Sequence, residues 1–82
     1  MTLDCTLYQR TLKNADSFML NLKEPIDQAT RICSITGCPI ACVYLYMLTF
    51  HYPGDIKLRQ GYDRVIEFYG YDEVIPFEKI SS

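Results

Sequence analysis

This chain of 82 residues contains four cysteines that could bind a metal, form disulfides or act as nucleophiles: Cys5, Cys33, Cys38 and Cys42. Four residues separate Cys33 from Cys38 and three separate Cys38 from Cys42, so the C-x-x-C pair typical of a zinc site is absent. Cys33 falls on the apolar face of a predicted helix and Cys42 inside an apolar run, where thiols are ordinary core residues. We therefore expect no metal site and no disulfide framework. Cys38, in a predicted turn, is the thiol expected to be exposed.

One histidine and seven tyrosines form a second group with chemical potential, in a chain that has no tryptophan. His51 follows a long apolar run, where it could be catalytic at a strand end or an ordinary loop histidine. Tyrosine is enriched in protein interfaces. Since Tyr44 and Tyr46 would share one face of a strand, we predict a binding surface made of Tyr44, Tyr46, His51 and Tyr52.

A predicted helix, Pro25 to Thr36, positions these residues and is the element around which the chain is organised. Proline suits the first helical position, and Gly37 suits the position just past the last. Apolar residues recur along one side with the 3.6-residue period, and polar residues occupy the other side. The run 40–50 is apolar at odd and even positions alike, which favours a strand covered on both faces.

The remaining segments predict three strands and a second helix. Residues 2–9 and 18–22 alternate apolar and polar side chains and predict a hairpin, with the turn formers of residues 13–17 between its strands. A helix is predicted over 61–69, ended by a glycine, and a last strand over 72–80, which Pro76 confines to a sheet edge or a bulge. The expected fold class is α+β, a small mixed sheet in the order β-β-α-β-α-β.

Length and charge limit the function classes. The chain has room for one small domain, residues 1–82. A net charge of −2 gives no basic surface for a phosphate backbone, so we expect no nucleic-acid partner. Residues 32–54 carry no charge, but Gly37, Pro39 and Pro53 interrupt the run, which favours a soluble helix and strand over a membrane span. The first residues show no secretory signal, so we expect a cytoplasmic location.

The predicted element order resembles the C-terminal half of the GNAT acyltransferases, which use acetyl-coenzyme A. The resemblance rests on Ile26 to Thr36 as the long helix, Gly37-Cys38-Pro39 as its exit, Val43 to Leu48 as the next strand and Arg64 to Tyr71 as the next helix and its end. In that family, the helix that corresponds to Arg64 to Tyr71 contains a Phe-Tyr pair, and its tyrosine can be the general acid that protonates the coenzyme A thiolate. The resemblance implies this role for Tyr69, which from its helical position alone would be a core aromatic residue whose hydroxyl reaches the surface.

The family's phosphate-binding loop has no counterpart in this chain. Where a glycine-rich loop would present backbone N–H groups to the coenzyme A pyrophosphate, the chain has Leu22-Lys23-Glu24-Pro25-Ile26-Asp27-Gln28. Pro25 removes one donor, and Glu24 and Asp27 place negative charge where the diphosphate would lie. We therefore expect no cofactor.

The leading functional hypothesis is a small protein-binding domain that acts as an inhibitor or regulator of another protein. Inhibitors of this size are common in phages, so a phage or mobile-element origin belongs to this hypothesis. An open sheet this short exposes an edge, which favours a homodimer or a partner paired there. The alternative hypothesis is a working N-acyltransferase with Tyr69 as acid and a backbone amide near Val43 or Tyr44 polarising the thioester.

Overall fold

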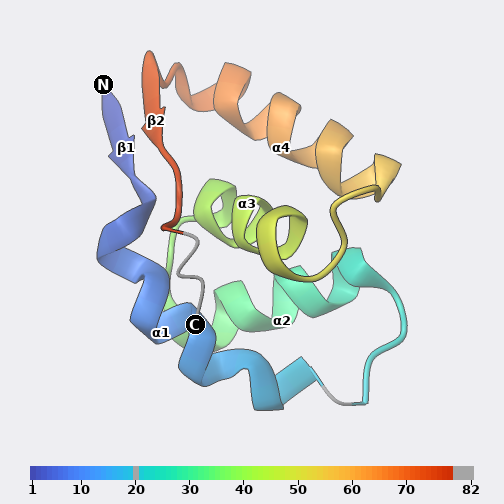
Figure 1. The fold of residues 1–82 in the computed structure, drawn as a ribbon. Coiled ribbons are helices and arrows are strands. Elements are labelled where there is room, and N and C mark those ends of the chain that lie inside the picture. Colours follow the sequence, from blue (N-terminus) through green and yellow to red (C-terminus); the bar gives the residue numbers. More distant parts are fainter. Residues whose placement is uncertain (20, 79–82) are drawn as a thin grey trace.

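Helices form most of the computed structural model, which describes residues 1–19 and 21–78 (Figure 1). A two-stranded parallel sheet pairs a segment near the N-terminus with the segment that follows the last helix. The elements in chain order are β1 (Thr2–Asp4), η1 (Cys5–Tyr8, a 3-10 helix), α1 (Gln9–Asn14), η2 (Ala15–Met19, a 3-10 helix), α2 (Pro25–Thr36), α3 (Ile40–Phe50), α4 (Ile56–Tyr69) and β2 (Glu73–Ile75).

Helix α2 has the bounds that the sequence predicts. Pro25 stands at the helix start, and Gly37 ends it with φ of 73°, a left-handed conformation that glycine adopts without strain. The Gly37 N–H donates to the Cys33 carbonyl oxygen at 2.9 Å. Ala29 and Ile32 are fully buried, as the apolar face requires. Gln28 was expected on the polar face but is buried, and its Nε2 donates to the Leu22 carbonyl oxygen at 2.6 Å.

The predicted strand over residues 40–50 is wrong, because this run is helix α3. A run that is apolar on every side fits a helix in the centre of a fold as well as a strand covered on both faces. Figure 1 shows α3 in the middle of the molecule, with α2 and α4 on either side of it. Its Cys42, Val43 and Met47 side chains are fully buried. Eleven residues also exceed the usual length of a buried strand.

The predicted hairpin at the N-terminus is also wrong. The strand forecast for residues 2–9 stops at Asp4, whose carboxylate accepts a hydrogen bond from the Thr6 N–H at 3.0 Å and so begins η1. Of the strand forecast for residues 18–22, Phe18 and Met19 lie in η2, and residue 20 lies outside the described residues. Local side-chain bonds of this kind compete with strand pairing, and alternation alone does not reveal them.

Helix α4 begins earlier than predicted and ends where predicted. Asp55 accepts a hydrogen bond from the Leu58 N–H at 2.9 Å, which sets the helix start five residues before Gly61. Gly70 ends the helix with φ of 70°. The forecast strand 72–80 is β2, three residues long before Pro76, and residues 79 and 80 lie outside the described part.

The β-β-α-β-α-β order and the mixed sheet are therefore corrected to a helical fold. Leu3 of β1 pairs with Val74 of β2, and the N–H of Asp72 donates to the carbonyl oxygen of Met1 at 2.9 Å. The small sheet thus fastens the first residues to the segment after α4. Within residues 1–19 and 21–78, no helix is long and apolar enough to cross a membrane.

Candidate functional site

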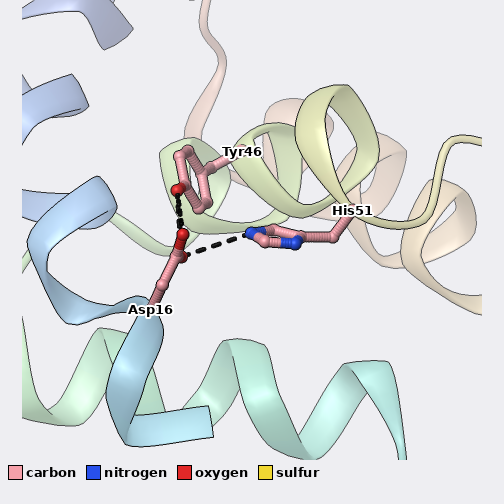
Figure 2. A network of polar contacts seen from close by, with 3 residues as sticks. All are labelled: Asp16, Tyr46 and His51. Carbon is pink, nitrogen blue, oxygen red and sulfur yellow. Dashed lines mark hydrogen bonds and ion pairs between the residues drawn. The ribbon is translucent and has the colours of Figure 1, made fainter.

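A carboxylate at the surface contacts a phenol from the central helix and an imidazole from the residue that follows this helix (Figure 2). Asp16 comes from η2, Tyr46 from α3 and His51 from the residue after α3. The Tyr46 hydroxyl lies 2.9 Å from each Asp16 carboxylate oxygen, and His51 Nε2 lies 3.2 Å from Asp16 Oδ1. We call these three residues the Asp16 network. It joins the N-terminal segment to the end of the central helix.

The charges in the Asp16 network fix the role of each group. Burial, reinforced by the hydrogen bond to the Asp16 carboxylate, raises the pKa of Tyr46 above its ordinary value, so the phenol stays protonated and donates. The carboxylate accepts from His51 when Nε2 carries the imidazole proton, which leaves Nδ1 to exchange a proton or accept a hydrogen bond. The arrangement can therefore relay a proton or hold a donor group.

Two hollows flank Asp16 and His51, which contribute to the walls of both. One hollow measures about 280 Å³ and takes its apolar wall from Tyr46 and Phe50. The other measures about 370 Å³ and includes Tyr52. Lys13 and Glu78 also line the first hollow, so it presents both charges. A positively or a negatively charged group could each find an oppositely charged side chain there.

The structure brings together three of the four residues predicted as a binding surface. Tyr46, His51 and Tyr52 lie around Asp16, although Tyr46 is only 3% exposed and serves mainly as core. Tyr44 lies apart from them, because in a helix it faces α4, where a Cβ at position 61 would come within 3.2 Å of its ring. The shared strand face was a consequence of the wrong strand prediction.

Asp16 is the functional candidate that the sequence interpretation missed. The sequence pattern predicts only a turn over residues 13–17. Asp16 meets Tyr46 across thirty positions of sequence, and a contact between segments so far apart leaves no periodic signal. Only the folded chain brings the Asp16 carboxylate next to the single histidine of the sequence (Figure 2).

A second candidate lies at the far end of α4 and consists of Phe68, Tyr69 and Tyr71, which we call the α4 aromatic cluster. The rings of Phe68 and Tyr69 are perpendicular, with centroids 5.1 Å apart, and those of Tyr69 and Tyr71 lie 5.8 Å apart. Phe68 is 81% exposed and Tyr69 is 52% exposed. Tyr71 is half-buried and packs against the core.

Tyr69 was expected to be either a core aromatic residue or, by resemblance, a general acid. The structure places it on the surface beside Phe68, so the core interpretation is wrong. The amide that would assist an acyl transfer was expected on a strand at Val43 or Tyr44. Because that strand is a helix, the Val43 N–H already donates to the Pro39 carbonyl oxygen, at 3.2 Å.

One cysteine, Cys38, is buried more deeply than predicted. Cys38 was expected to be exposed, but it is only 4% exposed, and Cys5 and Cys42 are completely buried. Within the part of the chain that the structure describes, no three side chains of the types that bind metals lie close enough together to hold an ion.

No family model, curated protein or solved structure matches the chain. The resemblance to GNAT acyltransferases therefore stays a prediction, although the sheet order that it implied is absent from this fold.

Proposed function

We propose that this chain is a protein-binding domain that acts as an inhibitor or regulator of a cytoplasmic partner, and that the α4 aromatic cluster anchors that partner. The observation that carries the proposal is the exposure of Phe68, of which 81% faces solvent, the largest exposed fraction among the large apolar side chains of the described residues. Neighbouring aromatic side chains left in water are typical of interaction surfaces.

The geometry of the cluster supports an anchoring role. Phe68 and Tyr69 hold each other in an edge-to-face contact, so little side-chain freedom is lost when a partner covers them. Covering a phenylalanine ring stabilises a complex by roughly 1.5–3 kcal/mol. Two such rings together supply enough free energy to dominate a small interface.

Other apolar side chains are exposed at the opposite end of the same helix and on the strand that follows it. Ile56 is 72% exposed at the start of α4, and Ile75 is 38% exposed on β2. The sheet has only two strands, so each strand has one edge without a strand partner among the described residues. A homodimer is one form that the proposed binding could take, with a second copy covering the cluster.

A site-specific photo-crosslinker tests the proposal. A benzophenone amino acid placed at position 68 is expected to capture one discrete partner, either a host protein or a second copy, and excess unlabelled wild-type chain should compete with this capture. The matched control carries the same group at Phe18, which is 50% exposed in η2, on the opposite side of the molecule from α4 (Figure 1).

Equal labelling from positions 68 and 18, or labelling that wild-type chain does not reduce, would refute the proposal. Sedimentation of the purified chain separates the two kinds of partner. A dimer that dissociates in the Phe68→Ala variant identifies the second copy, whereas a monomer identifies a different protein.

A further inference from the structure

Two buried thiols meet where the N-terminal segment crosses the central helix. The Sγ atoms of Cys5, the first residue of η1, and Cys42, in the first turn of α3, lie 3.3 Å apart. Both side chains are fully buried. Cys33 is arranged differently, since its Sγ lies 3.3 Å from the carbonyl oxygen of Cys38.

We propose that Cys5 and Cys42 form a reversible disulfide when the protein meets a peroxide, and that this bond fastens the N-terminal segment to α3. A disulfide needs the sulfur atoms about 2.05 Å apart, so the observed 3.3 Å leaves an approach of roughly 1.3 Å. Rotation about the two Cα–Cβ bonds and a small shift of the short η1 helix can supply this movement.

The pair contains one thiol suited to attack and one suited to resolve. The hydrogen bond between the two thiols lowers the pKa of Cys5, because the Cys42 thiol can donate to a Cys5 thiolate, and the same contact raises the pKa of Cys42. Cys5 is therefore the thiol that ionises first, and a thiolate is the form that reacts with peroxides.

The oxidation proceeds in two balanced steps. The Cys5 thiolate attacks one peroxide oxygen, an S–O bond forms as the O–O bond breaks, and the departing hydroxide takes up a proton, leaving a sulfenic acid and water. Cys42 then attacks the Cys5 sulfur, the S–S bond forms as the S–O bond breaks, and a second water leaves with the Cys42 proton. The peroxide takes both electrons. A dithiol reductant reverses the bond by thiol–disulfide exchange.

Access to the buried pair comes from local opening of the N-terminal segment. β1 holds only three residues and pairs with a three-residue strand. The ion pair between the Met1 ammonium and Asp72, at 2.6 Å, lies on the surface, where such pairs add little. Short terminal elements of this kind open far more readily than the core, and opening exposes Cys5.

The test is oxidation of the folded chain with hydrogen peroxide, followed by unfolding, alkylation and intact mass measurement. The wild-type chain is expected to lose about 2 Da and two alkylatable thiols. Tryptic digestion should then yield a linked pair of peptides, residues 1–10 and 32–57. The bond closes a loop of roughly 38 residues, so the oxidised chain should melt at least about 10 °C higher, and dithiothreitol should remove the increase.

Double variants identify the partners within the second peptide, which holds three cysteines. A chain with Cys33→Ala and Cys38→Ala keeps the proposed pair and should form the bond as readily as wild type. The matched control, with Cys33→Ala and Cys42→Ala, keeps Cys5 and Cys38 and should retain two alkylatable thiols. Equal crosslinking in the two variants, or two free thiols in the first after peroxide treatment, would overturn the proposal.

Discussion

Removal of one hydroxyl group, by Tyr46→Phe, tests whether the Asp16 network stabilises the fold. The hydroxyl donates to both Asp16 oxygens at 2.9 Å, whereas the ring packs beside Phe50 and Phe77, with centroids 5.1 and 5.6 Å away. Phenylalanine keeps those ring contacts and opens no cavity of consequence. The substitution therefore isolates the hydrogen bond to the carboxylate.

The magnitude follows from the charge of Asp16 and its exposure. A hydrogen bond to a charged group contributes roughly 1.5–3 kcal/mol when it is removed from water. The Asp16 side chain is 36% exposed, so water can replace part of the lost bond, and His51 still donates to the carboxylate. We expect Tyr46→Phe to lower the free energy of unfolding by about 1–2 kcal/mol, which lowers Tm by roughly 5–15 °C in a chain of this size.

Urea unfolding followed by circular dichroism measures this loss. Tyr44→Phe is the matched control, because Tyr44 lies on the same helix and its hydroxyl makes no hydrogen bond to the residues that the structure describes. Its expected change is below about 0.5 kcal/mol. A double-mutant cycle with Asp16→Ala should give a coupling energy near 1 kcal/mol. Equal effects of the two Tyr→Phe substitutions, or zero coupling, would refute the reasoning.

Three further predictions concern stability. Asp55→Ala should cost about 1 kcal/mol in urea unfolding, because it removes the hydrogen bond that caps α4; retention of wild-type stability would contradict this cap. Gly70→Ala should also cost about 1 kcal/mol, because φ of 70° strains alanine, and Gly54→Ala, where an added Cβ meets open space, is the control for the same assay. The free energy of unfolding should fall as the pH rises above about 10, because the pKa of Tyr46 is higher in the folded state than in the unfolded chain. A decline of the same slope in Tyr46→Phe would count against this explanation.

The sequence predicted the elements whose ends carry a local signal. Pro25 and Gly37 mark α2, and Gly70 marks the end of α4, because a fixed φ or a positive φ is a property of the residue itself. The central run 40–50 was assigned to the wrong class, since a pattern apolar on all sides carries no period to separate helix from strand. The order of the elements, and the fold class with it, depended on that assignment and on the predicted N-terminal hairpin.

The candidate site was predictable only in part, for the same physical reason. His51 and Tyr46 were identified by type, and they lie close because His51 directly follows the last turn of the helix that holds Tyr46. Asp16 and the Cys5–Cys42 contact depend on how the N-terminal segment crosses α3, and alternation there indicated a hairpin. The exposure of Phe68 could not be read from its pattern, because a helix end can face the core or the solvent with the same residues.

The affinity of the captured partner for the Phe68→Ala variant tests the central claim most directly. Calorimetric titration is expected to show at least a tenfold loss of affinity relative to wild type, with stability unchanged because Phe68 is 81% exposed. Phe18→Ala, the matched control, should bind as wild type does. Wild-type affinity in Phe68→Ala would contradict the account of this chain as a domain that binds through the α4 aromatic cluster.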